Sequence, residues 1–236
     1  MADSTLILAF DTATPHCSIA ITSGGVANGE ILASLSLGSG VTHSRRLLGS
    51  IEQLMQQASL RLAEVSGIAV GLGPGSFTGL RIGMATAKGL AHGADKVLIG
   101  ISSLDAIAAT INDERLICVL LDARKKEVYG RFYRVHSDGI ARPCSEHVVL
   151  PPEKIAEQIA EPVVMAGDGV DVYSGVLKEI LGEKMAQTDI RYPPAEMVGL
   201  LAGEQYRNNS FLDIAAAEPT YVRASDAELS LIRAKH

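Results

Sequence analysis

The chain has 236 residues, of which 47% are hydrophobic and 20% are charged, and this ordinary globular composition excludes a disordered or low-complexity chain. Its 21 basic and 27 acidic side chains give a formal net charge of −6, so it lacks the basic excess of a protein that grips nucleic acid unaided. The sequence has no membrane-length apolar run, no signal-peptide pattern and no closely spaced cysteine pair. We therefore expect a cytoplasmic protein without membrane association, built as one large domain or two lobes.

The first half of the sequence predicts a three-stranded meander followed by alternating helices and strands. Three apolar or alternating segments are separated by glycine turns, which is typical of consecutive antiparallel strands. A long segment with apolar residues at helical spacing comes next, then a buried strand that ends in a glycine loop, and then another helix. In chain order the predicted elements are strands 5–10, 17–22 and 31–37, helix 44–65, strand 67–72, helix 78–92, strand 97–101 and helix 104–111.

The second half repeats this order. Its first strand ends in Asp122, as the first strand of the chain ends in Asp11, and a later strand runs into Gly167–Gly169 as an earlier one runs into Gly73–Gly75. The predicted elements are strands 116–121, 128–135 and 147–150, helix 153–161, strand 163–166, helix 172–181 and helix 195–208. Such a repeat predicts two α/β lobes, each a mixed sheet with flanking helices, whose aspartates and glycine turns face one another across a cleft.

The most distinctive segment is GLGPGSFTGLRIG, residues 71–83, where a strand runs into a glycine loop and then into a helix. A loop of this kind offers backbone N–H groups to an anion at the helix N-terminus. It lacks the Gly-Lys-Ser/Thr of a Walker A loop and the spacing of a dinucleotide fingerprint. The glycines therefore either hold a phosphate or only form a tight turn, and both interpretations stay open.

Asp11 is followed by two hydroxyl side chains, in Asp11-Thr12-Ala13-Thr14. A carboxylate and hydroxyls in this arrangement can hold a Mg²⁺-bound phosphate through water. The alternative is a turn whose side chains satisfy their own backbone, and we favour a structural role of that kind for Asp122. The candidate nucleotide-binding residues are Asp11, Thr12, Gly73 and Gly75.

The helix 78–92 carries little side chain on much of its surface. Each interior glycine costs about 0.5–1 kcal/mol relative to alanine, which predicts that another backbone approaches this helix closely. The approaching element is either the helix 44–65 of the same lobe or another subunit, with which the two helices would form a four-helix arrangement. The small residues in and next to this helix are Gly79, Gly83, Ala85, Ala87, Gly89, Ala91 and Gly93.

The sequence contains no catalytic or metal-ligating cluster. His43 precedes a helix but is followed by Arg46 and Leu47 at the positions where a second helical metal ligand would stand. The Gly75–Gly79 segment has its serine one place too early for a nucleophile elbow, and Cys17 alternates within a strand as a core residue does. We therefore predict no metal site and no catalytic nucleophile, which argues against a metallopeptidase.

Four segments together resemble one known family. They are LAFDTAT (8–14), GLGPGSFTGLRIGMATAKGLA (71–91), LLDARKKEVY (120–129) and PTYVRA (219–224). Over nearly the whole chain the sequence is similar to the bacterial TsaB (YeaZ) family, the non-catalytic dimerisation subunits of tRNA threonylcarbamoyladenosine synthesis, once described as glycoprotease-like. The resemblance implies a duplicated actin, sugar-kinase and Hsp70-like ATPase fold with ribonuclease-H-like lobes. We assign residues 1–105 plus 215–236 to the first lobe and 106–214 to the second.

The resemblance also implies a role as scaffold or activator. The catalytic paralogue of this family binds metal through two histidines four residues apart, at the positions that hold His43 and Leu47 here. A small P-loop ATPase joins the two subunits, and the complex transfers threonylcarbamoyl to the adenosine next to the anticodon of tRNAs that read codons starting with A. The chain would need no cofactor of its own and would meet tRNA only through the complex.

Family members pair through the two helices of the first lobe, and a homodimer through the same helices is also plausible. The predicted interface residues are Leu48, Ile51, Met55, Gly83 and Ala87. Asp11, Thr12 and Gly73–Gly75 match the phosphate-facing positions of the fold. The rival hypothesis is therefore an ATP-dependent phosphotransferase or ATPase that uses Asp11 and the Gly73–Gly75 loop, with nucleotide in the cleft or at the subunit interface.

Overall fold

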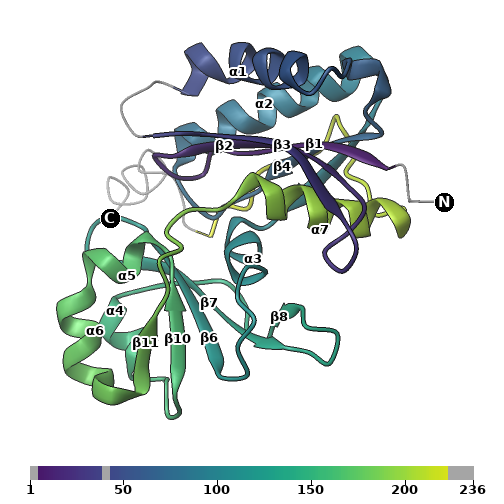
Figure 1. Ribbon diagram of the computed structural model, residues 1–236. Coiled ribbons are helices and arrows are strands. Elements are labelled where there is room, and N and C mark those ends of the chain that lie inside the picture. Colours follow the sequence, from purple (N-terminus) through teal and green to yellow (C-terminus); the bar gives the residue numbers. More distant parts are fainter. Residues whose placement is uncertain (1–4, 39–42, 223–236) are drawn as a thin grey trace.

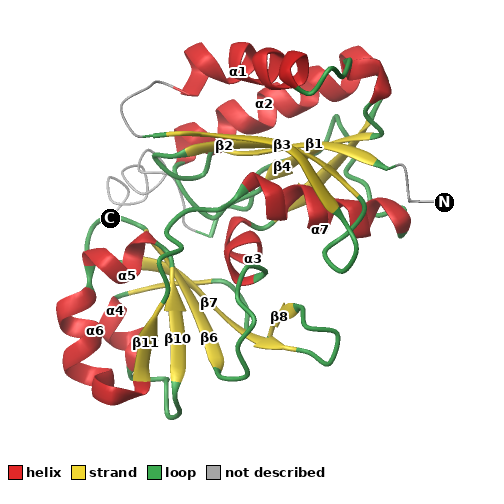
Figure 2. Cartoon of the chain, in the orientation of Figure 1, coloured by secondary structure: helices red, strands yellow, loops and turns green. Residues whose placement is uncertain are grey.

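The computed structural model of the protein describes residues 5–38 and 43–222, so residues 1–4, 39–42 and 223–236, which we assigned to the first lobe, lie outside it. Two separate sheets with helices on both faces form an upper and a lower lobe (Figures 1 and 2). No helix of the described segments has the length and apolar character needed to cross a membrane.

The first sheet has five strands in the order β3-β2-β1-β4-β5. The first three strands are antiparallel neighbours, and β4 and β5 continue the sheet from β1 in parallel. The bounds are β1 (Leu6–Asp11), β2 (Cys17–Ser23), β3 (Glu30–Leu37), β4 (Gly67–Gly71) and β5 (Val97–Ile101). The predicted meander and both later strands are confirmed.

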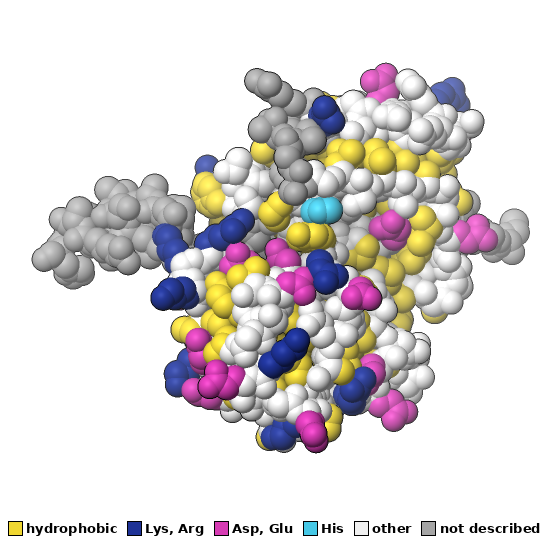
Figure 3. Space-filling model, turned by 60° about the vertical axis from the view of Figure 1, so that its left-hand side comes forward, with side chains coloured by type: hydrophobic (Ala, Val, Ile, Leu, Met, Phe, Trp, Pro, Cys, Tyr) yellow, Lys and Arg dark blue, Asp and Glu magenta, His cyan; other side chains and the backbone are white. Residues whose placement is uncertain are grey.

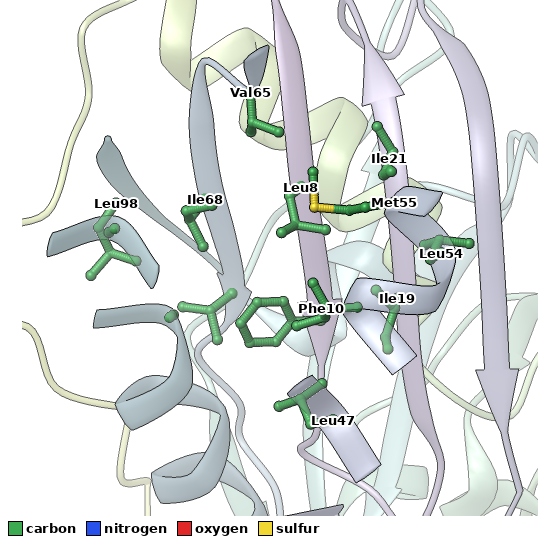
Figure 4. Packing of buried hydrophobic residues seen from close by; sticks show 14 of the residues in the cluster. Leu8, Phe10, Ile19, Ile21, Leu47, Leu54, Met55, Val65, Ile68 and Leu98 are labelled. Atoms are coloured by element: carbon green, nitrogen blue, oxygen red, sulfur yellow. The ribbon is translucent and has the colours of Figure 1, made fainter. Parts of the chain in front are cut away.

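Helices α1 (His43–Gln57) and α2 (Phe77–Ala94) cover one face of this sheet. Side chains such as Leu47 and Leu54 of α1 pack onto Phe10 and Ile19 of the strands (Figure 4). The predicted helix 44–65 is shorter than expected, because α1 stops at Gln57 and a separate 3-10 turn, η1 (Leu62–Glu64), follows.

The second sheet repeats the first, in the order β11-β10-β6-β7-β8, with β9 also paired to β7. Its antiparallel strands start at β6 and its parallel strands continue from β6 through β10, as they do from β1 through β4 in the first sheet. This confirms the predicted duplication. The bounds are β6 (Leu116–Asp122), β7 (Val128–Val135), β8 (Ala141–Pro143), β9 (Val148–Leu150), β10 (Val163–Ala166) and β11 (Met185–Gln187).

The helices of the second lobe depart from the prediction in their lengths. The predicted helix 153–161 is only α4 (Pro152–Ala156). The predicted helix 172–181 corresponds to α6 (Ser174–Leu181), and it is preceded by a short helix that was not predicted, α5 (Asp168–Val172), and followed by the turn η2 (Gly182–Lys184). Tyr173 separates α5 from α6, because it is the C-cap of the first helix and the N-cap of the second. Strands β8 and β11 were not predicted, because their three-residue segments ARP and MAQ lack the apolar run VVL that marks the equally short β9.

Two helices, α3 (Ser103–Ala108) and α7 (Ala195–Arg207), lie on the side of the first sheet that faces the second lobe. Val198 and Ala202 of α7 pack onto strands of the first sheet, although we assigned this helix to the second lobe by sequence. Helix α7 packs closely against the first lobe, since a Cβ at Gly203 would lie 1.7 Å from the carbonyl oxygen of Gly24. The predicted boundary between residues 105 and 106 falls inside α3, which contributes to the cores of both lobes.

Candidate functional site

A cleft of about 730 Å³ lies between the lobes, at the ends of β1 and β6. The glycine loop and the start of α2 form one wall, and the end of β6 with the turn at Asp168 forms the other. The predicted opposition of the two glycine turns is present, but of the two aspartates only Asp122 lines the cleft. Ala13–Pro15, Pro74–Thr78, Leu80, Arg81, Leu121–Lys125, Tyr129, Asp168 and Thr220–Val222 line it.

Asp11 is buried behind this wall rather than exposed in the cleft. One of its carboxylate oxygens accepts the hydroxyl of Ser103 at 2.5 Å and the other accepts the backbone N–H of Ala13 at 2.8 Å. Burial raises the pKa of the Asp11 carboxyl from 3.8 to about 6, although both hydrogen bonds favour its charged form. The side chain therefore serves as a link between β1 and the start of α3.

The other three candidate nucleotide-binding residues belong to the same closed arrangement. The Thr12 hydroxyl donates to the carbonyl of Gly79 at 2.8 Å, and the Gly73 N–H donates to the Ser103 hydroxyl at 3.2 Å. A Cβ at Gly75 would lie 2.2 Å from the carbonyl oxygen of Ala13. The structure thus brings the four predicted residues together, but of the four only Gly75 lines the cleft.

The opposite wall is organised by two aspartates, one at the end of β6 and one at the start of α5. The Asp122 N–H donates to a carboxylate oxygen of Asp168 at 3.0 Å, and the Asp122 carboxylate accepts the Tyr173 hydroxyl at 3.3 Å and pairs with Arg124 at 3.4 Å. The pKa of the Asp168 carboxyl is raised above its ordinary value, mainly because the side chain is buried. The structural role that we favour for Asp122 from the sequence agrees with these contacts.

Sequence reasoning missed the rim of the cleft. The guanidinium of Arg81 lies 4.0 Å above the ring of Phe77 and donates to the Tyr221 hydroxyl at 3.3 Å. On the opposite rim stands the basic turn Arg124–Lys126. In the sequence this turn stands out as one of two tight basic clusters, which we interpret from the sequence as solvated surface charge rather than as part of a site.

The predicted partner interface needs correction. Ile51, Met55 and Ala87 lie in the core between the helices and the sheet, and the Gly83 position faces Thr12, where a Cβ would lie 2.3 Å from the hydroxyl oxygen. Of the five predicted residues only Leu48, 58% exposed, has its side chain on the outside. Helical periodicity identified the apolar face of α1, and that face is turned towards the sheet.

The outer face of the two helices is made of different residues. Gly49 of α1 and Gly89 and Gly93 of α2 stand in open space among the described residues, because a Cβ added at any of them would meet no atom within 4 Å beyond the backbone of its own helix and its chain neighbours. Gly89, Gly93 and the exposed Ala85 follow at intervals of four, so they share one side of α2. We call the surface formed by Leu48, Gly49, Ala85, Gly89 and Gly93 the α1–α2 outer face.

The duplicated sheets with a cleft at their strand ends define a two-lobed α/β protein, each lobe a mixed sheet with flanking helices. The family model described as TsaD, tRNA N6-adenosine threonylcarbamoyltransferase, matches residues 39–231. The TsaB protein of Escherichia coli is 31% identical over 92% of this chain and 94% of its own length, and that of Bacillus subtilis is 26% identical over 97% and 99%. The solved structure of YeaZ from Pseudomonas aeruginosa superposes with a TM-score of 0.74 at 29% identity, over 92% of this chain and 99% of its own.

The chain belongs to the TsaB (YeaZ) family of tRNA threonylcarbamoyladenosine biosynthesis proteins.

Proposed function

We propose that the chain is a non-catalytic scaffold of a cytoplasmic complex that transfers threonylcarbamoyl to the adenosine next to the tRNA anticodon. Its α1–α2 outer face docks on the catalytic paralogue, and a small P-loop ATPase completes the complex. The observation that carries the proposal is the set of glycines on that face.

Glycine inside a helix lowers the stability of the helix, so a glycine at such a position needs a structural explanation. For Gly79 and Gly83 the explanation lies within the lobe, because Thr12 leaves no room for a side chain at either position. Gly49, Gly89 and Gly93 have no neighbour in the described part of the chain that requires them. Each costs about 0.5–1 kcal/mol relative to alanine, and the close approach of helices from another subunit would offset that cost.

The residue at position 47 supports a non-catalytic role. Leu47 stands where the resemblance places the second metal-binding histidine of the catalytic paralogue, and its side chain is buried against the sheet next to Phe10 (Figure 4). Among the residues the structure describes, no three His, Cys, Asp or Glu side chains gather as a metal site.

The rival, a phosphotransferase or ATPase, requires Asp11 and the glycine loop to face a bound phosphate. Both Asp11 oxygens instead accept hydrogen bonds from this chain, and the Gly73 N–H donates to Ser103. A nucleotide phosphate would have to break these contacts, which favours the scaffold. Nucleotide bound at the subunit interface stays compatible with it.

A reconstitution that omits one component tests the role. The catalytic paralogue, the P-loop ATPase, the carbamoyl-adenylate synthase, threonine, bicarbonate, ATP and tRNA are combined with and without this chain, and modified adenosine is measured by mass spectrometry. We expect modification only in its presence, and no ATP hydrolysis by the chain alone. Equal modification without the chain contradicts the scaffold, and hydrolysis lost in Asp11→Ala supports the rival.

Gly89→Arg tests the docking surface without disturbing the lobe. The arginine side chain enters open space, so we expect the circular dichroism and melting temperature to be preserved while the affinity for the catalytic paralogue falls by about tenfold or more. The matched control is Gly175→Arg, because Gly175 is also an open helical glycine but lies in α6 of the other lobe. Unchanged association of Gly89→Arg on a sizing column contradicts docking through this face.

A further inference from the structure

The turn between β6 and β7 has an unusual backbone. Arg124, Lys125 and Lys126 have φ angles of 61°, 55° and 63°, the left-handed region that favours glycine. The turn is closed by the Ala123 N–H, which donates to the carbonyl of Glu127 at 3.0 Å. Elsewhere in the described residues, non-glycine residues with positive φ are single. Strain of this kind is concentrated at functional sites, and here it presents consecutive basic side chains.

This strained turn forms one rim of the cleft. Arg124 and Lys125 line the cleft, and the side chain of Arg124 is 77% exposed while it pairs with Asp122. The cations therefore stand at the mouth of the cleft, where a ligand can reach them from solvent.

Aromatic side chains line the same cleft. The chain has four phenylalanines, six tyrosines and no tryptophan, and Phe77, Tyr129 and Tyr221 all contribute to this cleft. Phe77 and Tyr221 are 37% and 40% exposed with ring centroids 5.2 Å apart, and the Arg81 guanidinium covers Phe77. Figure 3 shows basic and hydrophobic side chains close together, with carboxylates among them, where the two lobes meet.

An aromatic and guanidinium surface opposite a basic rim suits a ligand that combines a flat ring with a phosphate, which is a nucleotide unit. Two sources supply this unit, a free nucleotide and an RNA strand. The deep loop that would enclose the phosphates of a free nucleotide is closed by Asp11, Thr12 and Ser103. The cations lie on the exposed rim instead, where a continuous phosphodiester backbone can pass.

We infer that the cleft binds single-stranded RNA, with a base stacked on Arg81, Phe77 and Tyr221 and a phosphodiester held by Arg124 and Lys125. The inference deepens the proposed function and rests on it for the class of RNA, because it makes this chain itself a contact of the tRNA substrate. It differs from the expectation that tRNA is met only through the complex.

The test measures binding of a fluorescently labelled anticodon-arm RNA hairpin to the full chain by anisotropy at low salt. The variant Arg124→Gly/Lys125→Gly removes both cations and at the same time supplies the residue that the left-handed backbone favours. We expect binding to be about tenfold weaker. The slope of the logarithm of the binding constant against the logarithm of the salt concentration should become shallower, by the amount that about one to two phosphate contacts contribute. The melting temperature should rise by a few degrees, because glycine suits the left-handed backbone. Phe77→Ala should weaken binding by about tenfold through lost stacking.

The matched control is Lys178→Gln/Lys184→Gln, which removes two exposed cations of the second lobe that do not line the cleft. Its affinity should stay within about twofold of the wild type. Gly/Gly and Phe77→Ala variants that bind like the wild type overturn the inference, as does the absence of binding by the wild type. Displacement of the RNA by ATP at equal concentration assigns the site to a free nucleotide and overturns it too, as does equal binding of a fully paired duplex.

The outcome is separable from the proposed function. Association of the Gly/Gly variant with the catalytic paralogue on a sizing column reports on the α1–α2 outer face alone. Intact association with lost RNA binding supports the cleft as a separate RNA site. A Gly89→Arg variant that no longer associates with the catalytic paralogue but still binds RNA supports the same conclusion.

Discussion

Gly79→Ala should destabilise the fold by about 3 kcal/mol, the upper end of the usual range for an overpacked site. The new Cβ would lie 2.0 Å from the carbonyl oxygen of Thr12, a backbone atom that no side-chain rotation can move. The start of α2 has to shift away from β1, and the hydrogen bond from the Thr12 hydroxyl to the Gly79 carbonyl is lost with it. Urea unfolding followed by circular dichroism measures the effect.

The matched control is the same substitution further along the same helix. Gly89→Ala places its methyl group in open space, so it should stabilise the isolated chain by about 0.5–1 kcal/mol through the higher helix propensity of alanine. Opposite signs at the two positions are the expected result. Equal effects at both would mean that the contact with Thr12 does not govern the position of α2.

Asp11→Asn should remove a large pH dependence of stability. The pKa of Asp11 rises from 3.8 to about 6 on folding because the carboxyl is buried, so the folded state favours the neutral form. The stability that the neutral carboxyl provides is fully present below pH 3.8 and is lost as the pH rises through about 6. A shift of about two pH units corresponds to about 3 kcal/mol. The amide of asparagine does not ionise, so the variant lacks this loss.

The measurement is the difference in unfolding free energy between wild type and Asp11→Asn as a function of pH, which cancels the other titrating groups. Relative to the wild type, the variant should gain about 3 kcal/mol between about pH 3.5 and pH 7. A difference that does not change with pH contradicts a buried carboxyl at this site. The same variant bears on the rival function, because an ATPase that depends on Asp11 should lose its activity.

These two positions matter because they lie between the two proposed surfaces. Asp11 ties β1 to Ser103 at the start of α3, and Thr12 ties it to Gly79 at the start of α2. The positions of the α1–α2 outer face and of the cleft therefore both depend on these hydrogen bonds. Residues that resemble a phosphate site in sequence serve here to fix the starts of α2 and α3, and α2 contributes residues to both surfaces.

The duplication and the class of fold could be predicted from local patterns in the sequence. Two strands that each end in aspartate, and two later strands that each run into a glycine turn, are such patterns, and the two sheets repeat one topology. Helical periodicity likewise found α1, α2 and α7, because apolar residues at intervals of three and four need only neighbours along the chain. The three-residue strands β8 and β11 carry too little pattern to be found in this way.

Which face of each element meets which neighbour became visible only in three dimensions. Periodicity marks Ile51 and Met55 as one apolar stripe, but only the position of the sheet shows that this stripe is buried and that the glycines of the opposite side face solvent. The contact between Arg81 and Tyr221 joins residues 140 positions apart, and Arg124–Lys126 adopt a left-handed backbone although none of the three is glycine. Such features depend on how the elements of each lobe pack, because periodicity along the chain does not say which neighbour an element meets.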